Sequence, residues 1–254
     1  MTVTAPFDAI AARYDELWTN TTAGRLQREA VWQRLAPHFR AGEHILDLGC
    51  GTGEDALHFE RAGVRVSAFD ASPAMVQAAR ERGVAANVLA LEDLDKLDGS
   101  YHGALSDFGA VNCVADPRIL RAPLARLIRP GGFFALCVIG RFCLRETVHF
   151  LMRGELRKAT RRWSGTSTSS SISLRVFYPT MGRLRKSFAP DFTLIESTGV
   201  GVFVPPSYIS PSPDTVLSGL DTMLSGFAAT DRRIAHLPGV RALADHRLLI
   251  FKRC

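Results

Sequence analysis

The chain has 254 residues, of which 46% are hydrophobic and 22% are charged. These fractions are ordinary for a globular protein and exclude a disordered chain, and the length favours one domain with an insertion over two independent domains. The net charge of +6 and the isoelectric point near 9.4 would suit a nucleic-acid-binding protein. Because the positive charge is concentrated in one late segment, we expect no nucleic-acid partner.

The start of the chain, residues 1–7, has neither the basic residues nor the apolar stretch of a secretory signal. No apolar run in the sequence is long enough to span a bilayer. The cysteines lack the C-x-x-C spacing of a zinc site and suggest no disulfide framework. They are Cys50, Cys113, Cys137, Cys143 and Cys254. We therefore expect a cytoplasmic protein with reduced thiols, no membrane span and no bound metal.

The first part of the chain alternates between helical and extended patterns. Amphipathic helices are expected at residues 7–18 and 24–35, before the first strand. Strands are then predicted at residues 45–48, 64–69, 88–91, 104–105 and 133–139, and helices at residues 55–61, 73–82 and 117–127. Ser72-Pro73 and Asp116-Pro117 are typical helix starts, and Gly83 is a typical helix end. This alternation predicts an α/β fold in which helices cover both faces of a parallel sheet.

After residue 139 the pattern changes. Residues 142–163 are helical and rich in arginine, and the Ser, Thr and Gly run at residues 164–173 predicts a mobile loop. Strands are expected at residues 173–178, 192–197 and 248–252, and a helix at residues 214–235. The chain is therefore divided into N-terminal helices (1–40), an α/β core (41–140), a basic helical cap insertion (141–190) and C-terminal elements that complete the sheet (191–254).

The most specific motif follows the first strand. The sequence runs His-Ile-Leu-Asp-Leu-Gly-Cys-Gly-Thr-Gly-Glu from residue 44 to residue 54, so a buried strand ends in a glycine-rich turn that opens a helix. Such a turn lets the backbone approach a ligand and present its amides. The spacing Gly49-x-Gly51-x-Gly53 places the third glycine one residue early for a dinucleotide fingerprint, which disfavours a nicotinamide-dependent oxidoreductase.

Residues 47–53 resemble the first motif of class I S-adenosylmethionine-dependent methyltransferases, and in particular the small-molecule group that includes ubiquinone and menaquinone methyltransferases. The resemblance implies a Rossmann-like, doubly wound, mostly parallel seven-stranded sheet. It also implies S-adenosyl-L-methionine as cofactor and S-adenosyl-L-homocysteine as product. In that family the turn holds the amino-acid part of the cofactor, which assigns this part to Asp47, Gly49, Cys50, Gly51 and Gly53.

Further cofactor contacts are expected along the edge of the sheet. Asp70 ends the second strand, where a carboxylate can accept both ribose hydroxyls, although a solvated or capping aspartate is the alternative. Beside it, the resemblance assigns the adenosine to Ala71, Ser72 and Met75, and the adenine to Glu92, Asp93 and Leu94. The alternative for residues 92–94 is an ordinary acidic loop that has no role in binding adenine.

Residues after the fourth strand and before the first strand complete the expected site. Ser106, Asp107 and Phe108 should line the floor between cofactor and substrate, because ligands bind outside the carboxyl ends of parallel strands. Tyr14 and Asp15 resemble the Tyr-Asp pair that precedes the first strand in many family members and helps form a lid over the methionine end of the cofactor. Arg25 or Arg28 would meet the cofactor carboxylate. Tyr14 and the two arginines are also ordinary residues for a helix surface.

Methyl transfer from a sulfonium is an in-line displacement, so positioning can supply much of the rate and no strong catalytic signature is required. A general base is needed only when the acceptor must lose a proton. The candidates are His149, Tyr178 and Tyr208, with Asn112 as a positioning group. A packed histidine on an apolar helix face is the plain alternative for His149.

The insertion carries the apolar residues Val148, Phe150, Leu151 and Met152 and the basic residues Arg153, Arg157, Lys158, Arg161 and Arg162. Such a segment could close over a hydrophobic substrate with an anionic end, or rest on an acidic membrane surface. The plain alternative is a solvated basic face with a packed apolar stripe. Peripheral membrane contact is therefore left open.

The sequence predicts methylation of an O, N or C atom of a small molecule, by a monomer or homodimer. The alternatives are an RNA or protein methyltransferase, or a cofactor-binding protein of the same fold without turnover. Methyltransferases acting on amino groups of bases or glutamine carry a Pro-Pro motif after the fourth strand, which is absent here. The similar run at residues 205–208 comes much later in the chain.

Overall fold

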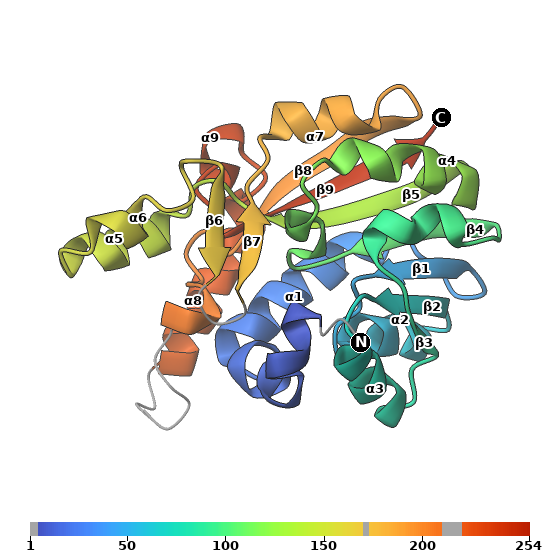
Figure 1. Cartoon of the computed structure of the whole chain (residues 1–254). Helices are drawn as coiled ribbons and strands as arrows, with labels where there is room; N and C mark the ends of the chain where they lie inside the picture. The colour runs from blue at the N-terminus through green and yellow to red at the C-terminus, as the bar shows by residue number, and fades with distance from the viewer. Residues whose placement is uncertain (1–4, 170–172, 210–219) are drawn as a thin grey trace.

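A computed structural model describes residues 5–169, 173–209 and 220–254. Within it, seven strands form one sheet in the order β3-β2-β1-β4-β5-β9-β8 (Figure 1). The strands are β1 (His44–Leu48), β2 (Arg65–Asp70), β3 (Ala86–Val88), β4 (Tyr101–Ser106), β5 (Ile128–Ile139), β8 (Phe192–Val200) and β9 (His246–Arg253). Strands β1 to β5 pair in parallel, whereas β9 is antiparallel to both β5 and β8. The predicted doubly wound, mostly parallel seven-stranded sheet is confirmed.

Helices cover both faces of the sheet. The helices α1 (Thr22–Leu35), α2 (Glu54–Arg61) and α3 (Pro73–Glu81) contribute to one buried apolar cluster. The helices α4 (Arg121–Leu127) and α7 (Met181–Phe188) contribute to the other. In α1, α2 and α3 most buried residues recur three or four positions apart, which is the spacing that gives a helix one apolar face. The two clusters hold the sheet between them, so its strand ends are fixed in space.

The sequence signals at helix ends agree with the structure. The Ser72 hydroxyl accepts a hydrogen bond from the Met75 amide at 3.2 Å, and the Asp116 carboxylate accepts one from the Arg118 amide at 3.2 Å. Gly83 follows α3 with a φ of +92°. These caps satisfy backbone donors that the first turn of a helix leaves unpaired.

Two predicted elements near the site differ in form. Residues 7–18 do not make one α-helix: Pro6–Arg13 is a 3-10 helix that contacts α3, and Asp15–Thr19 is a π-helical turn that hydrogen-bonds to the glycine loop. The third strand ends at Val88, where its partner β2 ends at Asp70. Leu91–Lys96, the segment that follows, is a 3-10 helix.

The insertion differs most from the prediction. Part of the expected loop is the strand β6 (Thr166–Ser169), which pairs antiparallel with β7 (Leu174–Phe177) in a separate two-stranded sheet. The polar composition of residues 166–169 predicted a loop. Threonine is nevertheless common in strands, and an exposed strand accepts polar side chains. The helices α5 (Leu144–Met152) and α6 (Leu156–Ala159) form an arm that projects from the molecule (Figure 1).

Three further helices bear on these expectations. Of the helix expected at residues 214–235, the part before residue 220 lies outside the described residues, and α8 (Leu220–Ile234) is present. The sequence did not predict α7, nor the short helix α9 (Pro238–Arg241). The α7 helix was missed because arginines and a lysine occupy its exposed face and only Leu184 and Phe188 mark its buried one.

The close packing around Gly49 in the glycine loop predicts how a substitution there changes stability. Gly49 has a φ of +82°, and a Cβ added to it would lie 2.2 Å from the Cβ of Ala110. Gly83 has a φ of +92° but open space around it. We expect Gly83→Ala to cost about 1 kcal/mol from the left-handed backbone alone. Gly49→Ala should cost at least about 2 kcal/mol more from overpacking, measured by chemical denaturation. Equal losses for the two variants would contradict this account of the loop.

Candidate functional site

The sheet has its topological switch between β1 and β4. The chain leaves β1 toward β2 and β3 on one side, and returns to β4 on the other. In open α/β sheets a crevice forms at this point, outside the carboxyl ends of the strands. The segments that follow β1, β2 and β4 therefore meet at one edge, and they contain most of the predicted cofactor residues.

Asp70 ties the glycine loop to the end of β2. Its Oδ2 accepts a hydrogen bond from the Gly51 amide at 2.9 Å, and its Oδ1 accepts one from the Ser72 amide at 2.8 Å. Burial raises the pKa of Asp70, and these two hydrogen bonds oppose the rise. Each carboxylate oxygen can accept a further hydrogen bond, so the tie to the backbone leaves Asp70 able to bind a hydroxyl.

Two buried carboxyl groups stand at the ends of adjacent strands. Asp47 in β1 is 1% exposed, and Asp107, just after β4, is 6% exposed. Asp47 Oδ2 and both carboxylate oxygens of Asp107 have no hydrogen-bond partner among the described residues. Burial, together with the neighbouring Asp55 carboxylate, raises the pKa of both groups well above the ordinary value. A buried carboxyl group without a partner is costly, and a cationic ligand would satisfy it.

Arg28 supplies the opposite charge at the same edge. Its guanidinium from α1 donates to Asp55 at the start of α2, and Trp32 Nε1 donates to the same carboxylate at 2.7 Å. Burial opposes the charge of Arg28, but Asp55 outweighs it and raises the pKa of the guanidinium. The Arg28 guanidinium also lies 4.7 Å from the centre of the Phe108 ring. The site therefore presents a fixed cation beside two carboxyl groups.

The N-terminal segment lies across the glycine loop. Asp8 accepts hydrogen bonds from the Ser72 hydroxyl at 2.5 Å and from the Ala74 amide at 3.1 Å. Asp15 accepts one from the Thr52 hydroxyl at 2.6 Å. Between them, the Tyr14 ring lies 3.8 Å from the place where a Cβ of Gly51 would be, and burial raises its pKa. The lid role of Tyr14 stays a prediction; the sequence paired Tyr14 with Asp15 but did not single out Asp8.

The remaining predicted cofactor residues have varied surroundings. Ser106 Oγ donates to the Leu48 carbonyl at 2.7 Å, so its side chain joins β4 to β1. Met75 and Leu94 are buried in the core, and Glu92 is exposed. Asp93 pairs with Lys96 at 2.8 Å on the surface of the 3-10 helix. The adenine contacts of Glu92, Asp93 and Leu94 therefore stay a prediction.

The candidate catalytic residues are not gathered in one place. His149 lies on the projecting helix α5, with its ring 5.1 Å from that of Phe150 (Figure 1). Asn112 donates to the carbonyls of Ile139 and Phe177 at 3.2 and 2.7 Å, and accepts from the Ile139 amide at 2.8 Å. All its hydrogen bonds join backbone segments, so it fastens the end of β5 to β7.

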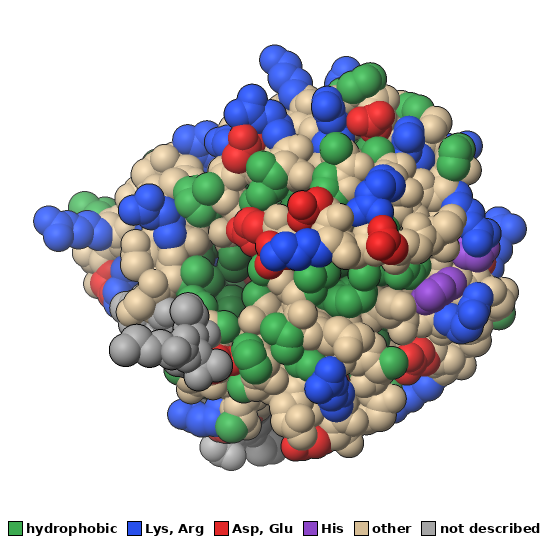
Figure 2. Space-filling view, turned by 45° about the vertical axis from the view of Figure 1, so that its right-hand side comes forward, with side chains coloured by type: hydrophobic (Ala, Val, Ile, Leu, Met, Phe, Trp, Pro, Cys, Tyr) green, Lys and Arg blue, Asp and Glu red, His purple; other side chains and the backbone are tan. Residues whose placement is uncertain are grey.

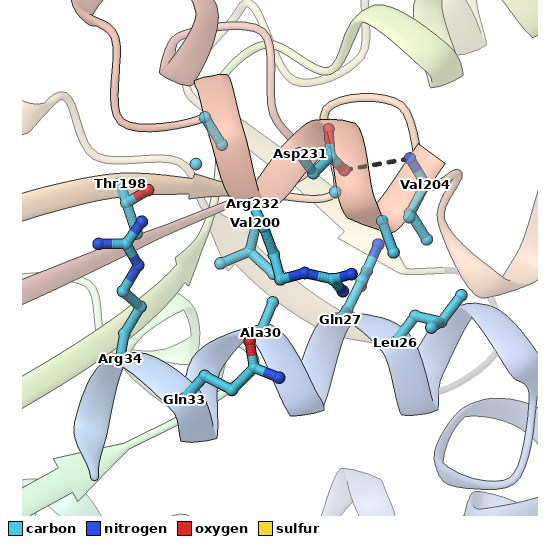
Figure 3. A pocket seen from close by; sticks show the side chains of 14 residues that line it. Leu26, Gln27, Ala30, Gln33, Arg34, Thr198, Val200, Val204, Asp231 and Arg232 are labelled. Carbon is cyan, nitrogen blue, oxygen red and sulfur yellow. Dashed lines mark hydrogen bonds between the residues drawn. The ribbon is translucent and has the colours of Figure 1, made fainter. Parts of the chain in front are cut away.

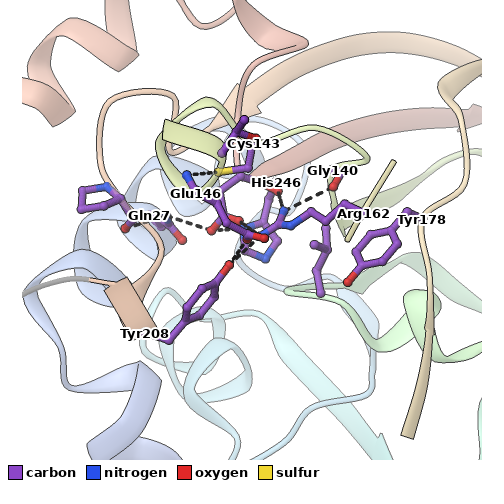
Figure 4. Close-up of polar contacts among 12 residues, drawn as sticks. Gln27, Gly140, Cys143, Glu146, Arg162, Tyr178, Tyr208 and His246 are labelled. Atoms are coloured by element: carbon purple, nitrogen blue, oxygen red, sulfur yellow. Dashed lines mark hydrogen bonds and ion pairs between the residues drawn. The ribbon is translucent and has the colours of Figure 1, made fainter. Parts of the chain in front are cut away.

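Arg162 is the centre of a buried polar cluster (Figure 4). It is 4% exposed and donates to Glu146 at 2.5 Å, to Asp245 at 2.8 Å and to the Tyr208 hydroxyl at 2.8 Å. The Tyr208 hydroxyl also donates to Glu146. The expectation that Arg162 belongs to a solvated basic face is wrong, because three partners hold it inside. This cluster fastens the arm to the start of β9.

His246 lies at the same edge and was not identified from the sequence. Its Nδ1 is 3.2 Å from Asp245 Oδ2, and its ring is 5.3 Å from that of Phe108. Burial opposes ionisation of Asp245, but His246 and Arg162 hold its pKa below the ordinary value. Because β9 runs antiparallel to β5, a residue at its beginning faces the carboxyl ends of the parallel strands. The position of β9 could not be read from the local sequence.

A cavity of about 270 Å³ lies beneath the β6–β7 hairpin. Its lining includes Tyr178, whose hydroxyl is 2.8 Å from Ser167 Oγ, and the two arginines Arg141 and Arg183. Val114 also lines it, and follows the segment after β4. One lining residue of the cavity therefore follows directly in the sequence on the segment after β4.

A second cavity, between α1 and α8, is much smaller. Its volume is about 40 Å³, with Gln27, Asp231 and Arg232 among the lining residues (Figure 3). The Asp231 carboxylate accepts from the amides of residues 202, 203 and 204. This cavity has room for little more than water, and the carboxylate that lines it, Asp231, already accepts hydrogen bonds from three backbone amides. We therefore interpret it as part of the structural contact between the two helices.

Two general features bear on the class of site. Across residues 5–169, 173–209 and 220–254, no helix has both the length and the hydropathy needed to span a bilayer. In the same ranges, no three His, Cys, Asp or Glu side chains are grouped so as to hold a metal ion.

The chain resembles known proteins over its core and in its fold. Residues 45–132 match the family model described as the methyltransferase domain. The demethylmenaquinone methyltransferase of Clavibacter sepedonicus is 33% identical over 142 residues, which cover 53% of this chain and 57% of that enzyme. The chain therefore spans little more than half the length of this relative.

Two solved structures share the fold over almost the whole chain. The CcbJ methyltransferase from Streptomyces caelestis has a TM-score of 0.63 at 16% identity, covering 99% of this chain and 98% of that one. The [4+2]-cyclase SpnF has a TM-score of 0.61 at 17% identity, covering 98% and 96%. At these identities the likeness shows the fold alone.

The unpartnered carboxyl groups predict a variant that stabilises the protein. The folded-state pKa of Asp107 lies above the unfolded value, so its ionisation costs stability as pH rises above about 4. Asp107→Asn should therefore raise the free energy of unfolding at pH 7 by about 1–2 kcal/mol, with no gain below pH 4. Denaturant melts at both pH values test this, with the exposed Asp95→Asn as control. A loss of stability at pH 7 would contradict the assignment.

Proposed function

We propose that the chain is a class I S-adenosylmethionine-dependent methyltransferase, which the match of residues 45–132 to the methyltransferase domain supports, and that it transfers a methyl group from S-adenosyl-L-methionine to an O, N or C atom of a small molecule. The observation that carries this proposal is a pair of buried carboxyl groups, Asp47 and Asp107, that lack hydrogen-bond partners in the described part of the chain on three of their oxygens, with Arg28 close enough to lower the pKa of both. The methionine part of the cofactor bears an ammonium, a carboxylate and a sulfonium, and so needs both kinds of charge.

Each part of the cofactor has residues that suit it. Asp47 and Asp107 would accept from its ammonium, and Arg28 would meet its carboxylate. Asp70 would accept from the ribose hydroxyls with the capacity left free by the two backbone amides. When bound, the cofactor supplies a methyl group on a positively charged sulfur, which leaves with the bonding electrons as a thioether. The chain positions the acceptor and excludes water.

The cavity beneath the β6–β7 hairpin is proposed to hold the acceptor. Its volume of about 270 Å³ suits a small molecule, and Arg141 and Arg183 favour an anionic or strongly polar group on it. The Clavibacter relative is named for its action on demethylmenaquinone, which makes a quinone-like acceptor a reasonable first probe. The hairpin belongs to the insertion, so we still propose that the insertion covers the substrate.

An acceptor that must lose a proton would require a base, and His246 is placed best for this role. It lies beside Phe108 at the carboxyl edge, and its Nδ1 is 3.2 Å from Asp245 Oδ2. Tyr178 and Tyr208 stay candidates for contacting the acceptor. His149 lies on the projecting arm and Asn112 is fully bonded to backbone groups, so we assign these two no chemical step.

A cofactor-binding protein of this fold without methyl transfer is the second candidate. The similarity in fold to a protein named as a [4+2]-cyclase favours keeping it, because the fold alone does not specify methyl transfer. An RNA or protein substrate has less support. On the face shown in Figure 2, Lys and Arg side chains are spread around the rim, with acidic and hydrophobic side chains between them.

The transfer experiment separates these candidates. Protein would be incubated with methyl-labelled S-adenosyl-L-methionine and a reduced demethylated quinone, and the products analysed by mass spectrometry. A labelled quinol together with S-adenosyl-L-homocysteine would support the proposal. Tight cofactor binding without transfer to any small molecule, peptide or RNA offered would favour the binding protein.

Replacing Asp107 should weaken cofactor binding although it stabilises the fold. Asp107→Asn removes a charged acceptor for the ammonium, so the affinity for S-adenosyl-L-methionine should fall at least tenfold, about 1.5 kcal/mol or more. Isothermal titration calorimetry measures this, with Asp95→Asn as the matched aspartate replacement on the surface. Unchanged affinity would reject Asp107 as a cofactor residue.

Cofactor binding should release protons. Asp47 and Asp107 have raised pKa values in the free protein, and a bound cation favours their ionised form. The pKa values therefore fall on binding, and affinity should rise with pH through the range in which these groups titrate. Calorimetry in two buffers of different ionisation enthalpy reports the protons released. Identical enthalpies in both buffers, or release undiminished in Asp107→Asn, would count against this coupling.

A further inference from the structure

The outer face of the α5–α6 arm has the reverse of the polarity expected for a surface helix. Val148, Leu151 and Met152 are spaced three and four residues apart, so they form one stripe on α5. They are 44%, 47% and 85% exposed, and Leu156 at the start of α6 is 63% exposed. The opposite face of α5, with Glu146, is buried against the molecule. The helix is therefore apolar on the side that faces solvent.

Basic side chains border this stripe. At the turn between the two helices and in α6, Arg153, Arg157 and Lys158 are exposed, and Glu155, which pairs with Lys158, is the one carboxylate in that stretch. Gly154, at the turn, has a φ of +72° with open space around it. The tip of the arm thus combines protruding apolar groups with an excess of positive charge.

The arm is held firmly at its base. Glu146 and Arg162, at its two ends, are joined to each other, and Arg162 is joined to Asp245 on β9. Figure 1 shows that α5 and α6 extend away from the sheet. The orientation of the exposed stripe is therefore set by buried ion pairs, which a merely loose surface segment does not need.

We propose that the α5–α6 arm docks the protein onto an anionic lipid bilayer, with Leu151, Met152 and Leu156 entering the interface and Arg153 and Arg157 contacting the headgroups. Charge complementarity favours this partner, because apolar groups flanked by arginine and lysine are the pattern of interfacial helices. A protein partner would more often bury such a stripe between polar rims of mixed charge. The inference does not depend on the methyl-transfer proposal.

The base of the arm adjoins the acceptor cavity. Arg141 precedes the arm and Ser164 follows it, and both line that cavity. Docking through the tip would therefore bring the cavity toward the bilayer without placing any spanning segment in it. A sparingly soluble acceptor would then reach the cavity from the membrane surface.

Co-sedimentation with vesicles tests the inference. Full-length protein is mixed with vesicles of phosphatidylcholine alone, or of phosphatidylcholine with phosphatidylglycerol, at low and high salt. We expect binding to the anionic vesicles that weakens with salt. Leu151→Gln with Met152→Gln should weaken this binding at least about tenfold, because the apolar contacts are lost. Arg153→Glu with Arg157→Glu should do the same through charge.

Matched controls replace exposed residues elsewhere. Ile119→Gln with Met223→Gln removes apolar groups that are 47% and 46% exposed, and Arg185→Glu with Lys186→Glu reverses two charges on α7. Both controls should bind vesicles as the parent protein does. Calorimetry with S-adenosyl-L-methionine and thermal melts would confirm that the arm variants stay folded.

Three outcomes would overturn the proposal. The first is that the parent protein does not sediment with anionic vesicles at low salt. The second is that the arm variants bind these vesicles as well as the controls do. The third is that size-exclusion chromatography shows a dimer that the arm variants convert to monomer, in which case a second copy covers the stripe. Cofactor binding is measured separately, so its failure would be distinguishable from each of these.

Discussion

The site depends on two buried carboxyl groups at the ends of adjacent parallel strands. Asp47 and Asp107 are buried by the same packing that holds β1 and β4 together, and neither is fully partnered within the described residues. Their cost is offset in part by Arg28, but Arg28 is already committed to Asp55. The edge of the sheet is therefore built with an excess of acceptors. Its architecture favours a ligand that brings its own positive charge.

The rest of the structure places groups around that edge. Asp70 joins the first two loops, and the N-terminal segment is fastened over them by Asp8 and Asp15. On the other side, Arg162 joins the insertion to β9. Both coverings are held by hydrogen bonds and ion pairs at their ends, so segments that are distant in the sequence meet at this edge of the sheet.

The sequence predicted the sheet and the glycine loop because both are encoded locally. Apolar runs mark the strands, and the glycines after β1 mark the turn. The form of the insertion was not predicted, since the pairing of β6 with β7 depends on a partner strand rather than on composition. The roles of Arg162 and His246 could not be predicted either. Both depend on where β9 returns to the sheet, which only the tertiary structure fixes.

The missing partners of Asp47 and Asp107 also bear on how long the chain survives in a cell. A ligand that binds only the folded state stabilises it by mass action, in proportion to the logarithm of its concentration. Proteases act mainly on chains that open, so an occupied crevice slows degradation. The abundance of the protein should therefore follow the supply of its cationic ligand, even at a constant rate of synthesis.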